Sequence, residues 1–468
     1  ILLRRGVCLG QRWRLAGSLV LAGMVATTVS ARAEDDAAAR AAEGSIASSL
    51  PGNGDPGGHR ARLKERGVTY MLTYIGEVLG NPSGGISQGT IAEGRLEFAV
   101  DADLEKLAGW KGLAFHFHGY QIHGTGLSTK HIGNFMTVSS IEALPTTRLF
   151  ELWLEQRMFD DKVSLRVGQL GADTEFFIST YATQLFNATF GWPANFGLDM
   201  PNGGPGYPFA TPGARLKVDP TANLSLLAGV FNGDPAGPSN DPQRANRYNT
   251  NFRVHDPALV MGEVQYRYGQ EKGAARLAGT VRLGGWYHFG RFEDQRFGTD
   301  GLSLADPASN GVALRHRGNG GIYGVIDQQI WRPASGEPDK GVGVFARVSA
   351  SPSDRNPIDF YVDGGIVFSG VVPGRPDDSF GAGIGYARFS DRARSLDRDF
   401  VASGALQPIR DHEAALEANY TAQVVPGWSL IPQLQYIWHP GGNVSDPANP
   451  ARAIPDALVL GARTIVRY

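Results

Sequence analysis

The sequence predicts an all-β fold, a transmembrane antiparallel β-barrel of about sixteen strands. From residue 70 onward, segments of roughly ten residues alternate polar and apolar side chains between turn residues. Gly supplies 62 of 468 residues, which suits many strands and tight turns. After residue 33 no apolar run is long enough to cross a bilayer as a helix. For a membrane protein this leaves a closed ring of strands, because backbone polar groups in hydrocarbon must be paired.

The first 33 residues have the features of a secretory signal peptide. Four arginines precede an apolar stretch at 15–29, and an Ala-Arg-Ala triplet ends at Ala33. A transmembrane anchor would need roughly 20 apolar residues, and this stretch is shorter. We therefore expect cleavage between Ala33 and Glu34. N-terminal sequencing of the membrane-extracted protein checks this, and a mature chain that begins at Ile1 would contradict it.

Removal of this segment limits the chemistry of the mature chain. The one cysteine, Cys8, would be lost, which leaves no disulfide, thiolate metal site or cysteine nucleophile. Five arginines and no acidic residue would also be lost, so the formal charge moves from −2 to −7. This charge disfavours a nucleic-acid partner. No cofactor is predicted.

The remaining chain divides into two parts. Residues 34–58 are rich in Ala and then in Gly and Pro, and 59–66 has room for a short helix, so 34–66 is predicted to be a mobile leader. Residues 67–468 are predicted to form the barrel.

The clearest pair of strands lies between residues 147 and 170, with a turn at 159–162. One face carries Phe150, Leu152, Leu154, Met158, Val163, Leu165 and Val167, and the other carries Glu151, Trp153, Glu155, Arg157, Ser164, Arg166 and Gly168. The apolar face would point inward in a soluble sandwich and toward lipid in a membrane barrel. The alternation alone does not choose between these folds.

Other segments repeat the pattern. Leu96, Phe98 and Val100 oppose Arg95, Glu97 and Asp101, and then Leu113, Phe115 and Phe117 oppose His116 and His118. Further strands are predicted at 213–218, 223–231, 258–268, 275–288, 321–331, 341–350, 358–369, 380–389, 412–424, 428–438 and 457–468. About sixteen strands make a barrel wide enough for an aqueous channel.

The end of the chain favours the barrel over the sandwich. Leu458, Leu460, Ala462, Thr464, Val466 and Tyr468 form one alternating face that finishes on an aromatic terminal residue. This resembles the C-terminal strand of outer-membrane barrels and predicts location in a bacterial outer membrane. Arg463 and Arg467 would then face the lumen.

Several longer motifs are shared with one family of such barrels. They are Arg166-Val-Gly-Gln-Leu170, Asp173-Thr-Glu-Phe-Phe177, Phe190-Gly-Trp-Pro193, Gly203-Gly-Pro-Gly-Tyr-Pro208, Gly285-Trp-Tyr-His288, Ile322-Tyr-Gly-Val-Ile-Asp-Gln328, Gln435-Tyr-Ile437 and Pro440-Gly-Gly442. Over residues 59–468 the chain resembles the carbohydrate-selective porin family (the OprB family). The resemblance implies a porin of about sixteen strands that passes monosaccharides such as glucose down their gradient. The terminal Tyr468 departs from the commoner Phe.

A long connection joins the strands that end near Leu170 and begin near Gly213. Its length of about forty residues far exceeds the usual median of about 4–6. It is too aromatic to be disordered, since it holds Phe176, Phe177, Tyr181, Phe186, Phe190, Trp192, Phe196, Tyr207 and Phe209. We expect it to fold inward as a constriction loop that presents Asp173, Glu175, Phe176, Trp192 and Tyr207. The alternative is an extracellular cap over the mouth.

The polar face of the first strands has the chemistry that sugar recognition requires. Planar hydrogen-bonding groups suit hydroxyls, and aromatic faces suit the C–H side of a sugar ring. The predicted pore-lining residues are Arg95, Glu97, Glu151, Trp153, Glu155, Arg157 and Arg166. The alternative for each charged residue is a structural ion pair within the barrel.

Other sites are not predicted. His116 and His118 share a strand face and could bind a metal with His123, but no carboxylate spacing completes a site. The glycines at 381, 383 and 385 alternate within a strand and suit close packing better than a nucleotide loop. No Ser lies in a nucleophile-elbow context, so no enzyme is expected.

The competing hypotheses are a general porin and a structural or adhesive barrel plugged by residues 34–66. Bilayer conductance separates them from a sugar-selective porin. Small carbohydrates and outer-membrane lipid are the expected partners, and both a monomer and a homotrimer remain open.

Overall fold

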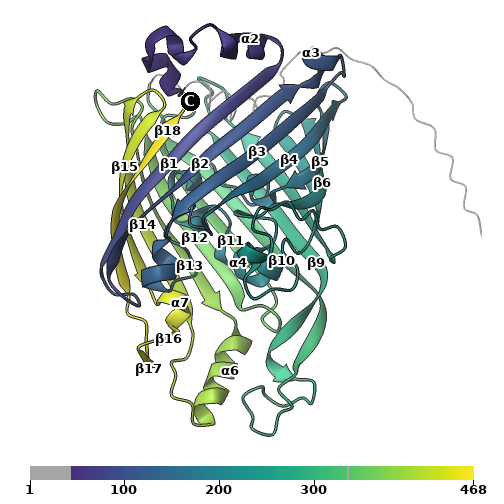
Figure 1. The fold of residues 1–468 in the computed structure, drawn as a ribbon, viewed down its shortest axis with the longest axis vertical. Helices are drawn as coiled ribbons and strands as arrows, with labels where there is room; N and C mark the ends of the chain where they lie inside the picture. The colour runs from purple at the N-terminus through teal and green to yellow at the C-terminus, as the bar shows by residue number, and fades with distance from the viewer. Residues whose placement is uncertain (1–43, 335–336) are drawn as a thin grey trace, which may run out of the picture.

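The structure, a computed structural model, describes residues 44–334 and 337–468. Within them sixteen strands form one closed barrel, in which each strand pairs antiparallel with its neighbours (Figure 1). β1 to β15 follow one another around the wall, and β18 closes the ring between β15 and β1. The predicted all-β barrel is confirmed. The proposed signal peptide, residues 1–33, lies outside the described residues.

The strands are β1 (Val68–Ser83), β2 (Gly89–Asp103), β3 (Leu113–Gly124), β4 (Thr146–Met158), β5 (Val163–Leu170), β6 (Thr211–Thr221), β7 (Leu224–Asn232), β8 (Ala258–Tyr268), β9 (Gly279–Gly298), β10 (Ala313–Trp331), β11 (Gly341–Ala350), β12 (Ile358–Ser369), β13 (Ser379–Phe389), β14 (His412–Val425), β15 (Trp428–Trp438) and β18 (Ala457–Arg467). Two short strands, β16 (Ser445–Asp446) and β17 (Asn449–Ala453), form a hairpin outside the barrel. Most barrel strands lie within a few residues of their predicted bounds. β9 and β10 extend further, because they continue as a paired hairpin whose side chains no longer alternate between apolar and polar.

The described helices are short. They are α2 (His59–Glu65), α3 (Leu104–Ala108), α4 (Ala194–Asp199), α5 (Pro242–Ala245), α6 (Asp391–Ala402) and α7 (Pro440–Asn443), with single turns η1 (Ile46–Ser49), η2 (Pro51–Gly54), η3 (Ser128–Ile132), η4 (Ala172–Thr174), η5 (Ala182–Gln184), η6 (Ala188–Phe190) and η7 (Pro201–Gly203). None of the described helices has the length and apolar character needed to span a bilayer.

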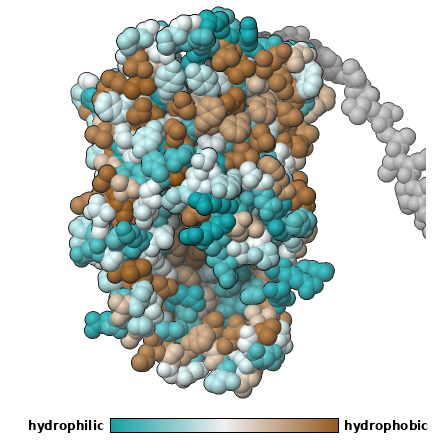
Figure 2. All heavy atoms as spheres, viewed as in Figure 1, coloured by the Kyte–Doolittle hydropathy of each residue, from teal (hydrophilic) through white to brown (hydrophobic). Residues whose placement is uncertain are grey.

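The two faces of the wall differ in polarity. Large apolar side chains stand exposed on the outer face, among them Leu283 at 64% and Ile322 at 71%. Figure 2 shows such side chains gathered over the upper half of the barrel wall. Carboxylates and arginines of the alternate positions, such as Glu263, Arg347 and Glu417, are buried inside. This arrangement is inverted relative to a soluble protein, and it places lipid outside and polar groups within.

Short and long connections alternate around the barrel. At the end that holds both described termini, β4 and β5 are joined by residues 159–162, and β14 and β15 by 426–427. At the other end the connections include 125–145, 171–210 and 390–411. In outer-membrane barrels the short turns face the periplasm and the long loops face outward. The termini therefore mark the periplasmic end.

Residues 44–66 lie across the periplasmic rim, beside the end of the chain (Figure 1). The Arg60 guanidinium sits 4.8 Å from the ring centre of Tyr468, and the Tyr468 hydroxyl donates to the Gly54 carbonyl. This segment thus covers the closing strand of the barrel.

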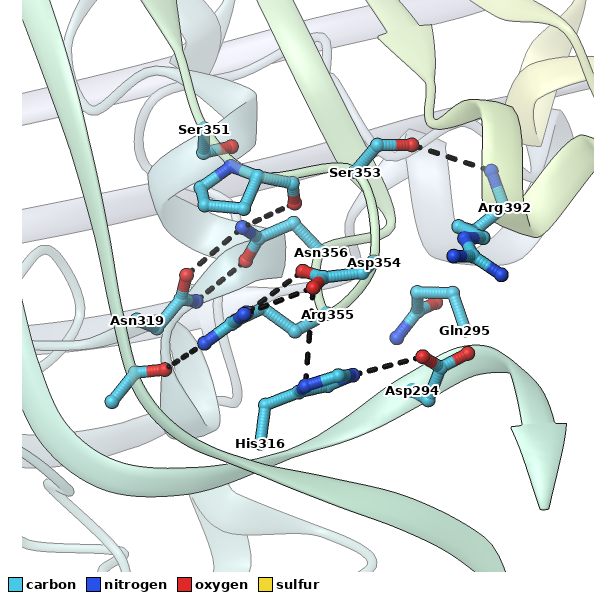
Figure 3. Close-up of polar contacts among 12 residues, drawn as sticks. Asp294, Gln295, His316, Asn319, Ser351, Ser353, Asp354, Arg355, Asn356 and Arg392 are labelled. Atoms are coloured by element: carbon cyan, nitrogen blue, oxygen red, sulfur yellow. Dashed lines mark hydrogen bonds and ion pairs between the residues drawn. The ribbon is translucent and has the colours of Figure 1, made fainter. Parts of the chain in front are cut away.

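The long loops contact one another at the outer end. His316 on β10 lies between Asp294 and Asp354, with nitrogen–oxygen distances of 2.8 and 3.8 Å (Figure 3). Arg355 donates to Asp354 and lowers the pKa of that carboxyl. In the same group the Arg392 backbone N–H donates to Ser353. These contacts tie the β9–β10 hairpin to the β11–β12 loop and to α6.

The structure corrects one predicted side-chain direction, that of Phe150, and the suggestion that His123 could join His116 and His118 at a metal. Phe150 was expected on the lipid face, but it is 2% exposed. The register moves from His118↔Glu151 to Gly119↔Leu149, so a β-bulge at Phe150 turns this ring inward beside Glu151. His123 lies on the opposite face from His116 and His118 and stacks on the outward-facing Tyr74.

Candidate functional site

The connection between β5 and β6, residues 171–210, folds into the barrel as predicted. Its Phe177 lies with ring centres 4.5 Å from Tyr323 on β10, and its Phe176 lies 6.1 Å from Phe231 on β7. Together with Phe196 these rings form a buried apolar cluster against the inner wall. We call residues 171–210 the inner loop. Because the inner loop runs into the barrel, the alternative interpretation of this segment as an extracellular cap over the mouth is excluded.

Carboxylates of the wall hold the inner loop by its backbone. Glu263 on β8 accepts the Phe177 N–H at 2.8 Å, and Asp327 on β10 accepts the Thr180 N–H at 3.1 Å. Glu417 on β14 accepts the Asn187 N–H at 2.7 Å. The loop therefore spans the lumen from β8 to β14. Buried carboxylates are stable in such a place because they accept several hydrogen bonds.

Arg347 is the most heavily used anchor. Its side chain is fully buried, pairs with Asp363 on β12, and donates to the carbonyls of Phe177, Thr189 and Gly191 at 2.9–3.1 Å. One guanidinium thus fixes three points of the inner loop.

Glycines let this loop approach the wall. A Cβ added to Gly381 on β13 would lie 2.7 Å from the Gln184 side chain. The interpretation of the 381–385 glycines as close-packing positions in a strand is confirmed.

A second loop, residues 125–145 between β3 and β4, also enters the lumen. The Met136 N–H donates to Glu413 at 2.6 Å, and Gln435 donates to the Val138 carbonyl at 2.7 Å. The sequence analysis did not predict this course. The only signal was the length of the connection, which exceeds the usual median.

The predicted pore-lining residues gather on the wall formed by β2 to β5. Arg95 pairs with Glu97, and its guanidinium lies 4.5 Å from the ring centre of Tyr120 and 4.7 Å from that of Tyr207 in the inner loop. The Arg95 and Glu97 side chains are 13% and 12% exposed, so they still face the passage.

Trp153 is the centre of the neighbouring part of this wall. Its ring stacks on His116 at 4.6 Å, and the Arg166 guanidinium lies 3.7 Å from its centre. Arg166 also pairs with Glu175 of the inner loop at 2.6 Å and with Glu155 at 3.4 Å. We call Arg95, Glu97, Tyr120, Trp153, Arg166, Glu175 and Tyr207 the lumen patch.

The remaining predicted site residues have other surroundings. Glu151 accepts the Gly171 N–H at 3.0 Å and so anchors the start of the inner loop. Phe176 and Trp192 pack in the apolar cluster of that loop. Arg157 lies beside the turn that follows β4.

Asp173 accepts the Tyr207 N–H at 2.7 Å and links two ends of the inner loop. Burial raises the pKa of this carboxyl to about 7. Its charge therefore changes near neutral pH.

Sequence reasoning missed Arg215 and Tyr120. Arg215 on β6 is 1% exposed and pairs with Glu155 at 3.1 Å. The strand pattern places both residues inward: alternation along β3 from His116 and His118 could have found Tyr120, and alternation along β6 with Ala214 and Leu216 could have found Arg215.

Two groups of the described residues have the donors of a metal site. They are His116, His118 and Glu151 in the lumen, and Asp411, His412 and His439 near the outer loops. The expectation that no carboxylate joins His116 and His118 is wrong, because Glu151 comes from the neighbouring strand.

A closed sixteen-stranded barrel with a lipid-facing outer wall and loops folded into a charged lumen defines an outer-membrane porin. The chain belongs to the carbohydrate-selective porin, OprB family, whose sequence model matches residues 87–468. It is an outer-membrane channel for passive diffusion of carbohydrates.

Two individual proteins and one solved structure are similar to this chain. Porin B of Pseudomonas aeruginosa is 27% identical over 91% of this chain and 93% of its own length. The putative porin QuiX of Acinetobacter baylyi is 22% identical over 87% of this chain and 91% of its own length. The high-pH structure of Pseudomonas putida OprB shares the fold, with a TM-score of 0.77 and 23% identity over 88% of this chain and 97% of that one.

Proposed function

We propose that glucose-like monosaccharides cross the barrel along the lumen patch, which forms the constriction together with the inner loop. The observation that carries this proposal is the set of partly exposed, ion-paired arginines and carboxylates beside the half-buried ring of Trp153 on one wall. The charged groups can hydrogen-bond sugar hydroxyls. The edge of the Trp153 ring supplies the apolar contact for C–H groups, because His116 and Arg166 cover its two faces. Because each charge has a partner, no single strong charge would trap the solute.

Side-chain exposure divides the charged residues between the two roles considered from sequence. Glu155 and Arg215 are each 1% exposed and serve as a structural ion pair. Arg95, Glu97 and Glu175 are 12–13% exposed and remain available to solute. We assign sugar contact to the second group, to Trp153 and to Arg166, which is 9% exposed.

Planar-bilayer recording with added glucose tests this function. A selective channel conducts and is partly blocked by sugar, a general porin conducts without competition, and a plugged barrel shows no steady conductance. Liposome swelling with mono- and disaccharides then identifies the preferred size. Passage is proposed to involve no catalytic step, so the sugar should emerge unchanged.

Replacing Arg166 by Ala should weaken sugar block about tenfold, because charge-assisted hydrogen bonds contribute about 1.5–3 kcal/mol. Ion conductance should rise or stay constant, since volume is removed from the passage. Arg157→Ala should act in the same direction but more weakly, because Arg157 lies nearer the periplasmic turn than the inner loop. Both effects are measured by single-channel recording with a sugar titration.

Arg267→Ala is the matched control. Arg267 on β8 donates to Ser225 at 3.0 Å, away from the lumen patch. The Arg267→Ala substitution should leave sugar block unchanged. If both Arg166→Ala and Arg157→Ala keep the parent sugar preference and conductance, the two arginines do not lie at the constriction.

Asp173 predicts a pH dependence of ion selectivity. Because the pKa of Asp173 is raised in the folded protein, the folded state keeps a proton that the unfolded chain has lost. The contribution of Asp173 to the free energy of unfolding is therefore complete below the ordinary carboxyl pKa range. This contribution is lost as the pH rises through about 7. The same ionisation adds a negative charge beside Tyr207. Cation selectivity, measured as the reversal potential in a KCl gradient, should increase from about pH 6 to about pH 8.

Asp173→Asn keeps an acceptor for the Tyr207 N–H and removes the charge, so its selectivity should change little over this range. Asp377→Asn, at an exposed turn between β12 and β13, is the control and should behave like the parent protein. A parent protein with pH-independent selectivity would contradict the assignment.

A further inference from the structure

Strand register brings two histidines and a carboxylate together on the lumen wall. His116 and His118 point inward from β3, and His118 is directly opposite Glu151 on β4. One potential ligand atom from each of His116, His118 and Glu151 lies within 4.8 Å of the other two. The His116 Nε2 is 4.0 Å from the Glu151 Oε2.

A second carboxylate orients His116. Asp101 on β2 is opposite His116 in register, and its Oδ1 lies 2.7 Å from the His116 Nδ1. A proton on Nδ1 leaves Nε2 as the lone-pair nitrogen, and this nitrogen is the one that lies 4.0 Å from the Glu151 Oε2. Metal-binding histidines usually have such a carboxylate on the nitrogen that does not bind the metal.

Glu151 and His118 each have one side-chain atom that is available to bind a metal ion. Glu151 is held through Oε1, which accepts from the Gly171 N–H at 3.0 Å and the Thr174 hydroxyl at 3.3 Å. Its Oε2 therefore remains toward His116. The His118 Nε2 is buried and has no hydrogen-bond partner among the described residues, an arrangement that costs free energy unless something binds there.

We propose that His116, His118 and Glu151 bind a divalent transition-metal ion such as Zn²⁺. Two imidazoles and one carboxylate form a donor set that zinc takes in proteins, with a fourth position left for water. The ligand atoms need to approach by about 1 Å to reach zinc–nitrogen distances of about 2.0–2.1 Å. The nearby arginines are already neutralised, since Arg95 pairs with Glu97 and Arg166 pairs with Glu155 and Glu175.

Binding of zinc to the purified full-length barrel in detergent tests the proposal. Because Asp411, His412 and His439 form a second group of donors, the titration uses the His412→Gln/His439→Gln background. Calorimetry should then show one saturable Zn²⁺ site per chain, and Co²⁺ should give the visible d–d absorption of a low-coordinate site.

Substitutions assign the site to its residues. His118→Gln should abolish saturable binding, and Asp101→Asn, which acts through His116, should weaken it by about tenfold or more. His123→Gln is the matched control, since His123 is on the same strand but on its outer face, and it should leave binding unchanged. Heat-modifiable mobility checks that each variant is folded. No saturable binding in the background protein, or equal binding in folded His118→Gln, overturns the proposal.

A second readout is channel block. His116 stacks on Trp153, so a bound ion would narrow the passage and zinc should reversibly reduce sugar flux in the same background. This readout depends on the proposed function, whereas binding does not. Saturable binding without block supports the metal site and counts instead against a passage beside Trp153.

Discussion

Deletion of Val466 to Tyr468 is expected to reduce the assembled barrel to a trace of its normal amount. Val466 pairs with Trp428 on one side and with Tyr74 on the other, so these residues are the final rungs of the seam that closes the barrel. The Tyr468 N–H donates to the Leu72 carbonyl at 2.8 Å, and the Leu72 N–H donates back at 3.1 Å. Without them two strand edges are left unpaired beside lipid, which a membrane barrel does not tolerate.

The amount of heat-modifiable protein in isolated outer membranes measures this effect. Tyr468→Phe is the control, because it keeps the aromatic ring and removes only the hydroxyl bond to the Gly54 carbonyl. That bond should contribute no more than about 1 kcal/mol, so assembly should remain near normal. Normal assembly of the truncated chain would contradict the role of the seam.

The strands could be predicted from sequence because each crosses the same two environments. Because successive side chains face lipid and lumen in turn, apolar and polar residues alternate along each strand. Turn residues separate one alternating segment from the next. The pattern fails where only one environment is present. The outer half of the β9–β10 hairpin lies beyond the wall, and its polar residues on both faces concealed the strand. The bulge at Phe150 was hidden for a different reason, since the register of β3 against β4 depends on both strands.

The site could be predicted only in part. The aromatic content of residues 171–210 indicated an inner loop, and alternation placed Arg95, Trp153 and Arg166 in the lumen. The partners that hold the loop could not be found, because Arg347 and Phe177 are far apart in sequence and meet only when the barrel closes. The same holds for Glu151 and His118, whose closeness follows from strand register.

Replacing Arg347 by Ala should have the largest effect on the channel itself. It removes the partner of the fully buried Asp363 and leaves three carbonyls of the inner loop without their donor. Breaking a buried ion pair from one side costs about 3–5 kcal/mol. We expect lower resistance to thermal unfolding in detergent and, because the loop is released from β11, a larger and noisier single-channel conductance with weaker sugar block.

Arg388→Ala separates loop anchoring from the general loss of an ion pair. Arg388 on β13 pairs with Asp359 on β12, but its side chain is 41% exposed and the described contacts do not join it to the inner loop. Exposed pairs contribute about 0–1 kcal/mol, so both stability and conductance should stay close to the parent values. Arg347→Lys should be intermediate, since an ammonium can still reach Asp363 but cannot serve the three carbonyls together. If Arg347→Ala folds and conducts like Arg388→Ala, the inner loop is held mainly by Glu263, Asp327 and Glu417, and the guanidinium is not its principal anchor.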